Sequence, residues 1–225
     1  MKVKIYVEGG GNNNKYLEIE CRKGFKLFFE KSGFVGMMPS VIPCGRRNQA
    51  YRNFCTSVTT DNQEQISLLL VDSEDAAPHR FEDVWSFLKE RETDNWQKPD
   101  NAEDKHAHLM VVCMEAWLVS DKSALKKYYG KDFKVNALPQ RSDIENIVKS
   151  DLFKHLRLAT KETQKGEYSK GGHSFELLGM IDPKLVFVAS PWAKRLIDEL
   201  KKHLNLCLLS AYPFKPYKNL TINKT

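Results

Sequence analysis

Three acidic residues follow segments that have the pattern of strands, one alternating and one continuously apolar. Glu8 comes directly after residues 2–7, KVKIYV, and Asp72 and Glu74 end the run that begins with residues 66–71, ISLLLV. In an open parallel sheet the carboxyl ends of the strands share one edge, and ligands bind beyond that edge. We therefore expect these three carboxylates to lie together.

Carboxylates at one edge repel one another unless a cation lies between them, and such hard oxygen ligands suit Mg²⁺ or Mn²⁺. We expect Glu8, Asp72 and Glu74 to be metal ligands and catalytic residues, with Glu8 able to act instead as general base. Glu115, after another apolar run, is a further candidate ligand. A metal there could polarise a phosphoryl oxygen and activate a water. The alternative is that these acids cap the following helices or face solvent.

Small and basic residues near the first and second strands could bind phosphate. The turn that begins with Gly9 and Gly10 could present backbone N–H groups, together with Lys15, to a phosphate at a helix start. Arg46 and Arg47 open the next predicted helix, and their guanidinium groups suit a phosphodiester. The alternatives are a flexible turn and arginines that face solvent.

A second basic candidate is the Lys- and Gly-containing segment 161–174, KETQKGEYSKGGHS. Its Lys161, Lys165 and Lys170 could supply salt-sensitive, sequence-independent contacts to a nucleic-acid backbone. The alternative is an ordinary solvated loop.

Strands and helices alternate over the first part of the chain. The pattern predicts strands at 2–7, 38–43, 66–71 and 109–114, and helices at 15–32, 45–58, 80–91 and 115–129. This alternation requires crossover connections, so it predicts an α/β fold in which helices sandwich a parallel sheet.

The sequence pattern changes after the first 135 residues, where the alternation of strands and helices ends. We expect an α/β domain over 1–135 and a helical C-terminal extension over 136–225, packed on it, with helices at 142–158 and 192–204. The part after Ser210 contains two prolines and is expected to run along the surface.

Composition excludes several classes of protein. No apolar run approaches the roughly 20 residues that span a bilayer, and the N-terminus lacks the pattern of a signal peptide. Five cysteines without CxxC spacing do not suggest a disulfide framework or a structural zinc site. A cytoplasmic protein is expected. The net charge of +6 permits nucleic-acid binding without requiring it.

The acid pattern resembles that of the TOPRIM fold of topoisomerases, primases and OLD-type nucleases. In that fold a glutamate ends the first strand and an Asp-x-Asp motif ends the third. Here the corresponding segments are VEGGG, with Glu8, and LLLVDSED, with Asp72 and Glu74. The Asp-x-Glu of this chain keeps the second carboxylate but places it on a longer side chain.

The chain is also similar to domain-of-unknown-function family 4276, a TOPRIM-like bacterial family related to OLD-type nucleases. The similarity covers nearly the whole chain. It is carried by VEGGG, CGRR at 44–47, VDSE at 71–74, HLMVVCMEAW at 108–117 and ATKETQKGEYSKGGHSFELL at 159–178. Members are often encoded beside AAA or ABC-type ATPases, in settings that suggest phage defence, so the resemblance implies an ATPase partner.

These observations and the resemblance predict a Mg²⁺-dependent TOPRIM-type nuclease that cleaves DNA or RNA, as part of an ATPase-associated phage-defence system. The alternative is a non-catalytic TOPRIM-like subunit that binds an ATPase or nucleic acid. A third hypothesis is an enzyme that hydrolyses nucleotides or transfers phosphate between small molecules. The sequence is also compatible with a homo-oligomer.

Overall fold

A computed structural model describes residues 1–11, 13–62 and 64–204. The surface extension that the sequence suggested after Ser210 lies outside these residues. Four strands form one sheet in the order β2-β1-β3-β4, and every pair is parallel. The strands are β1 (Lys2–Val7), β2 (Ser40–Pro43), β3 (Gln65–Asp72) and β4 (Ala107–Met110). With helices around this sheet, the predicted α/β fold is confirmed.

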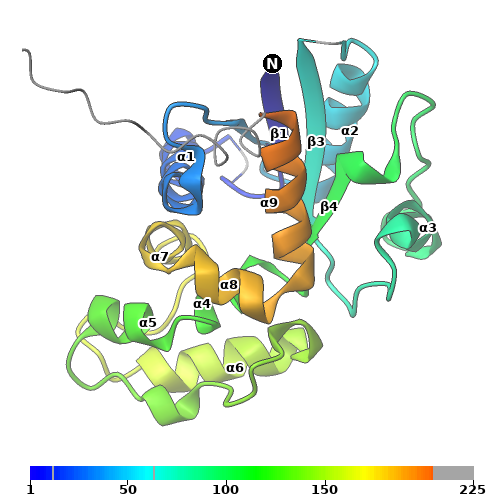
Figure 1. Cartoon of the computed structure of the whole chain (residues 1–225). Helices are drawn as coiled ribbons and strands as arrows, with labels where there is room; N and C mark the ends of the chain where they lie inside the picture. Colours follow the sequence, from blue (N-terminus) through cyan, green and yellow to red (C-terminus); the bar gives the residue numbers. More distant parts are fainter. Residues whose placement is uncertain (12, 63, 205–225) are drawn as a thin grey trace, which may run out of the picture.

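The central strand β3 explains why the sheet is parallel and covered. Residues Ile66 to Asp72 are all buried, as expected for a strand with helices on both of its faces. Figure 1 shows α1 (Lys15–Phe29) on one side of the sheet, and α2 (Arg47–Val58) and α3 (Val84–Glu90) on the other.

The remaining helices follow β4 in the chain, and most of them gather beyond the carboxyl ends of the strands (Figure 1). These helices are α4 (Met114–Val119), α5 (Lys122–Tyr129), α6 (Lys149–Thr160), α7 (Ser174–Met180), α8 (Pro183–Ala189) and α9 (Pro191–His203). Helix α9 packs on β4, and α7 packs along α1. The second half of the chain therefore contributes to the same hydrophobic core as the first.

Short helical turns connect these elements. They are the π-helical turn η1 (Glu30–Phe34) and the 3-10 turns η2 (Phe81–Asp83), η3 (Asp104–His106), η4 (Val135–Ala137) and η5 (Ile144–Asn146). None of the helices that the structure describes is both long and apolar enough to cross a membrane.

The contact between α1 and α7 brings two backbones close together. An added Cβ at Gly24 would lie 2.4 Å from the carbonyl oxygen of Phe175, so only glycine fits at this crossing. At the other end of the contact, Lys31 donates to three carbonyl groups at the carboxyl end of α7, those of Gly179, Met180 and Ile181. Helix α7 is thus fixed at its start against α1 and at its end against the turn that follows α1.

Several predicted boundaries are wrong, for identifiable reasons. The apolar run 109–114 predicted a strand, but β4 ends at Met110 because the following buried residues already turn toward α4. The single helix predicted over 115–129 is two helices, because the Asp121 side chain accepts from the backbone N–H of Ala124 and starts α5 anew.

The second half holds further differences. Helix α6 begins at Lys149, later than predicted, because residues 144–146 form a 3-10 turn instead. Helices α7 and α8 were not predicted. Each has only seven residues, which is too short to give a clear helical periodicity.

Candidate metal centre

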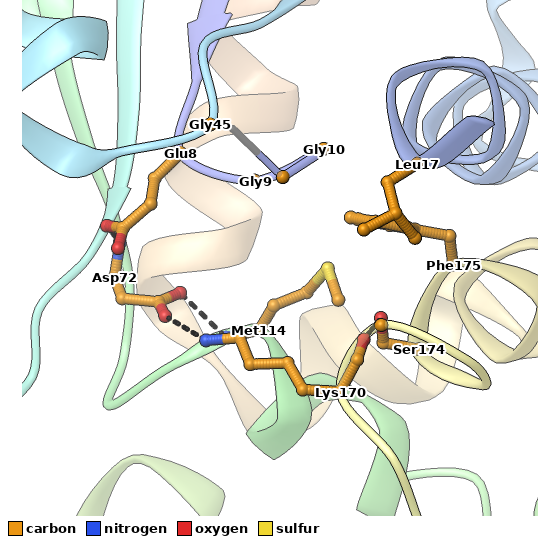
Figure 2. Close-up of a pocket in the computed structure, with 12 residues that line it drawn as sticks. Glu8, Gly9, Gly10, Leu17, Gly45, Asp72, Met114, Lys170, Ser174 and Phe175 are labelled. Carbon is orange, nitrogen blue, oxygen red and sulfur yellow. Dashed lines mark hydrogen bonds and ion pairs between the residues drawn. The ribbon is translucent and has the colours of Figure 1, made fainter. Parts of the chain in front are cut away.

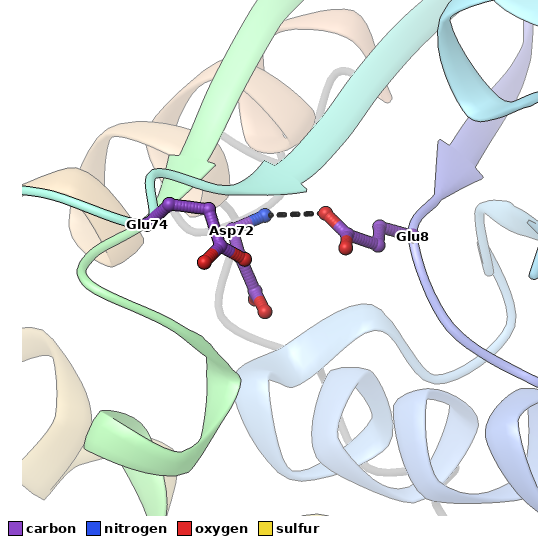
Figure 3. Close-up of side chains that lie close together, drawn as sticks. All are labelled: Glu8, Asp72 and Glu74. Carbon is purple, nitrogen blue, oxygen red and sulfur yellow. Dashed lines mark hydrogen bonds between the residues drawn. The ribbon is translucent and has the colours of Figure 1, made fainter. Parts of the chain in front are cut away.

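Glu8, Asp72 and Glu74 converge at the carboxyl ends of the two central strands (Figure 3). Carboxylate oxygens from the three residues, one from each, all lie within 4.8 Å of one another. The backbone N–H of Asp72 donates to Oε2 of Glu8 at 3.2 Å, which links the end of β3 directly to the end of β1. The structure therefore brings together three of the four acids that the sequence singled out.

Glu74 reaches the cluster because the backbone turns after β3. Its φ of 69° is in the left-handed region, which a residue with a Cβ rarely adopts. Its N–H donates to the carbonyl of Val112 at 2.8 Å, so the turn is fixed by the loop after β4. Left-handed residues other than glycine concentrate at functional sites. The turn thus directs the Glu74 side chain back toward Asp72.

Each carboxylate has at least one oxygen fixed by a protein donor. Oε2 of Glu8 accepts from Arg47 and from the backbone of Asp72, and Oε2 of Glu74 accepts from Lys149 at 2.6 Å. Oδ1 of Asp72 accepts from the N–H of Met114 at 2.9 Å. Within the residues that the structure describes, no donor reaches Oε1 of Glu8 or Oε1 of Glu74. These oriented oxygens remain available to a ligand.

Two lysines bring positive charge to the cluster. Lys149 pairs with Glu74, and Lys170 lies 3.4 Å from Oδ2 of Asp72 with 55% of its side chain exposed. For both lysines, burial acts to lower the pKa, but the neighbouring carboxylates outweigh it and raise the pKa. Both side chains therefore carry a full positive charge beside the acids.

The acids themselves are held in an unfavourable environment. Burial is the main cause that raises the pKa of Asp72 to about 7, and repulsion from Glu8 adds to it. Burial also raises the pKa of Glu8, while Arg47 and Lys170 act in the opposite direction. A strongly perturbed carboxyl group in a cleft is typical of a functional site. The protein's own cations leave part of this negative charge uncompensated.

Glu115 lies near the cluster but outside it. The residue is buried in α4, where Oε1 accepts from the hydroxyl of Tyr168 at 2.9 Å. Oε2 is buried and has no hydrogen-bond partner among the residues that the structure describes, and Lys170 lies 4.0 Å from it. Glu115 therefore faces the same lysine as Asp72, and it is not one of the three converging acids.

The guanidinium of Arg47 is bonded to groups of the protein, whereas the sequence suggested that it binds a phosphate. Its guanidinium forms a bidentate pair with Asp94, whose side chain is only 1% exposed, and donates to Glu8 and to the carbonyl of Asp72. The ring of Trp96 lies against it, 4.8 Å from the guanidinium carbon. Arg47 thus orients the acids.

The other basic candidates are dispersed. Lys15, Arg46 and Lys161 are exposed, and Arg46 lines a separate polar hollow beside the start of α2. The ammonium group of Lys165 lies 4.2 Å from the ring centroid of Tyr128. Among the four lysines that were predicted to bind phosphate, only Lys170 pairs with a carboxylate of the cluster.

A cavity of about 270 Å³ opens beside the acids. Figure 2 shows Glu8 and Asp72 on one side of it and Leu17 and Phe175 on the other, with Lys170 and Ser174 along the third wall. Its lining residues are Glu8, Gly9, Gly10, Gly11, Leu17, Gly45, Asp72, Met114, Lys170, Gly171, Ser174 and Phe175. The Gly9 and Gly10 turn predicted for phosphate therefore contributes a wall of this cavity.

Sequence reasoning missed several residues of the site. Lys149, Tyr168, Asp94 and Phe175 lie outside the strands that end at Glu8 and Asp72, and nothing in their local pattern connects them to these acids. Tyr168 lies in the Lys- and Gly-containing segment 161–174, and both Tyr168 and Phe175 lie in segment 159–178, which carries part of the family resemblance. That resemblance was the available signal for two of the four.

Comparison with known proteins gives one family match. No curated protein and no solved structure matches the chain. The model of the family described as "Domain of unknown function (DUF4276)" matches residues 7–201, which include all three acids and both lysines of the cluster. The chain belongs to this family.

Proposed function

We propose that the protein is a Mg²⁺-dependent phosphodiesterase of TOPRIM type that hydrolyses DNA or RNA. One observation carries the proposal, namely that oxygens of Glu8, Asp72 and Glu74 converge within 4.8 Å of one another at the sheet edge. The resemblance described above supports a cytoplasmic role beside an ATPase partner in phage defence.

The donor set fits a hard divalent cation. Carboxylate oxygens are the ligands that Mg²⁺ and Mn²⁺ prefer, and Mg²⁺ usually takes one or two of them together with waters. Glu8, Asp72 and Glu74 would hold the ion, and its charge would oppose the burial that raises the pKa of Asp72. When bound, the metal would polarise a phosphoryl oxygen and make a water a better nucleophile.

The remaining work falls to groups of the chain itself. Where Glu8 does not hold the ion, its Oε1 can instead accept a proton from a water, because Arg47 and the backbone of Asp72 occupy only Oε2. The ammonium groups of Lys170 and Lys149 lie beside the acids and can stabilise negative charge on a phosphate. The geometry thus supports hydrolysis better than a nucleophilic mechanism through a side chain.

The test is cleavage of labelled DNA and RNA with Mg²⁺, with Mn²⁺ and with EDTA. We expect metal-dependent cleavage by the wild type and a loss of at least about 100-fold in Glu8→Gln and Asp72→Asn. Asp132→Asn is the matched control, because Asp132 is exposed and its left-handed backbone suits asparagine. Cleavage that persists in both site variants, or that survives EDTA, would refute the proposal.

A second candidate function is a non-catalytic subunit that binds an ATPase or nucleic acid. The observation that favours it is that Lys170 and Lys149 already pair with two of the three acids, which reduces the need for a metal. This alternative predicts no thermal shift with Mg²⁺ and copurification with an ATPase that does not depend on Glu8. Calorimetry with Mg²⁺ on the wild type and Glu8→Gln separates the two functions.

A further inference from the structure

The cavity beside the acids has two chemically different sides. On one side lie the carboxylates of Glu8 and Asp72 and the ammonium of Lys170, and on the other lie Leu17 and Phe175 (Figure 2). The Met114 side chain lines the space between them. Phosphate chemistry explains the first side and leaves the apolar side without a role.

Three elements build the apolar side. Leu17 comes from the first turn of α1, Met114 from the start of α4 and Phe175 from α7. The Phe175 ring packs against Gly9, where an added Cβ would lie 3.3 Å from its tip. These side chains are fixed in the core or at its rim, so the apolar surface is formed before any ligand arrives.

We infer that this side of the cavity receives one unstacked nucleobase, whose phosphate lies at the acids. The inference rests on the proposed function and narrows its substrate to single-stranded, or locally unpaired, nucleotides. A base inside a duplex is stacked between its neighbours and cannot enter this cavity unless it leaves the stack. Bases that are unstacked commonly bind against aromatic side chains.

The size and connectivity of the cavity agree with one base. Its volume of about 270 Å³ lies just below the roughly 300–1,000 Å³ typical of sites for larger organic ligands. Lys170 and Phe175 also belong to one short segment, in which the hydroxyl of Ser174 donates to the carbonyl of Lys170. The same segment therefore contacts the acidic side and forms the apolar side.

Binding of 5′-mononucleotides in Mg²⁺ buffer, compared with ribose 5-phosphate, tests the inference. Neither compound contains a phosphodiester bond, so the proposed reaction cannot consume them. Ligand-observed saturation-transfer NMR and competition give the affinities. We expect mononucleotides to bind about tenfold or more tightly than ribose 5-phosphate, since stacking on an aromatic side chain contributes that much per base. Equal binding of the two compounds would overturn the inference.

The variant Leu17→Trp fills the cavity from α1 without touching the acids. We expect it to weaken mononucleotide binding by about tenfold. Ile19→Trp is the matched control, because Ile19 is on the same helix, is 57% exposed and does not line the cavity. We expect it to retain wild-type affinity. If Leu17→Trp melts early, Leu17→Ala replaces it, and unchanged affinity in that variant would overturn the inference.

A final comparison tests whether the bound base belongs to a free nucleotide or to a polynucleotide strand. Single-stranded DNA and RNA 12-mers, the matching duplexes and a 12-mer of abasic nucleotides compete with the mononucleotide for the cavity. We expect the intact single strands to compete and the duplex and abasic strands to compete at least about tenfold more weakly. If only free nucleotides compete, the cavity binds a base, but the inferred single-stranded polymer substrate is refuted. Cleavage that is equal on duplex and single strands would overturn the inference while leaving the phosphodiesterase intact.

Discussion

The ammonium nitrogen of Lys170 lies 3.4 Å from Oδ2 of Asp72, although the two residues are 98 positions apart in the chain. Asp72 ends the central strand, whereas Lys170 belongs to the loop before α7. The acidic site is therefore completed by the second half of the chain. The lysine also competes with any metal for Asp72, because both cations are attracted to the same carboxylate.

Replacing Lys170 by methionine tests this competition. Removing one positive charge beside Asp72 favours a second cation there, so we predict that Lys170→Met binds Mg²⁺ several-fold more tightly. The same variant should bind a phosphate-containing substrate more weakly, since it lacks the ammonium group. Calorimetry with Mg²⁺ and the KM for an oligonucleotide give the two values.

Lys161→Met provides the control for this charge effect, because Lys161 is exposed and pairs with no carboxylate of the cluster. Its Mg²⁺ affinity should equal that of the wild type. Weaker Mg²⁺ binding by Lys170→Met would show that the lysine supports the metal site instead of competing with it.

The backbone at Glu74 allows function to be separated from stability. Both Glu74→Gln and Glu74→Gly remove the carboxylate and should weaken Mg²⁺ binding. Glycine adopts the φ of 69° without a Cβ penalty, whereas glutamine keeps a strain of about 1 kcal/mol. We predict that Glu74→Gly is more stable to urea than Glu74→Gln by about that amount. Equal stability of the two variants would mean that the left-handed backbone costs little.

The grouping of the acids could be predicted from the sequence. Glu8 follows a strand that is recognised by its alternation and Asp72 one that is apolar enough to be recognised as buried, and parallel strands place their carboxyl ends at one edge. Glu74 was expected there because it ends the same apolar run as Asp72. The structure places it there by another route, since β3 ends at Asp72 and a left-handed turn directs Glu74 back.

The partners of the acids could not be predicted in the same way. Arg47 lies beside a glycine turn and has the appearance of a phosphate ligand, yet its orientation depends on Asp94, 47 positions away. Lys149 reaches Glu74 across 75 positions. Such pairs depend on how loops and helices pack over the sheet, which local patterns of hydrophobicity do not encode. The repulsion among the carboxylates predicted that cations would lie near them, but the sequence did not identify the residues that supply those cations.

The raised pKa of Asp72 predicts how metal binding changes with pH. A carboxyl group whose pKa rises from 3.8 to about 7 on folding takes up a proton in the native state. The resulting contribution to stability is present below about pH 3.8 and is lost as the pH rises toward 7. The metal-free protein should therefore lose this contribution between those values.

Mg²⁺ must displace that proton, so its affinity should rise between about pH 6 and 8. Thermal shifts with saturating Mg²⁺, measured across this range, check the prediction. Asp72→Asn has no such proton to lose, and its much weaker Mg²⁺ binding should not depend on Asp72 titration. A Mg²⁺ affinity of the wild type that is flat from pH 6 to about 8 would contradict the raised pKa.

The glycine at the crossing of α1 and α7 links packing to the cavity. In Gly24→Ala the new methyl group would meet the carbonyl oxygen of Phe175 at 2.4 Å, and a backbone cannot move aside as a side chain can. Because the contact is with backbone, we predict a cost toward the upper end of the about 1–3 kcal/mol that is typical of overpacking, and this exceeds the gain of about 1 kcal/mol from helix propensity. Displacing Phe175 should also weaken mononucleotide binding.

Gly179→Ala offers the matched comparison on the partner helix. There the added Cβ would meet the end of the Leu27 side chain at 2.8 Å, and Leu27 is 37% exposed and free to change rotamer. We therefore predict that Gly179→Ala stays within about 1 kcal/mol of the wild type in urea unfolding. The order of the two variants is the test, because steric contact with backbone and contact with a mobile side chain differ in whether the neighbour can yield. If Gly179→Ala is instead the more destabilised variant, the contact between Gly24 and the backbone of Phe175 does not set the distance between α1 and α7. The wall that Phe175 forms beside Gly9 would then not be rigid.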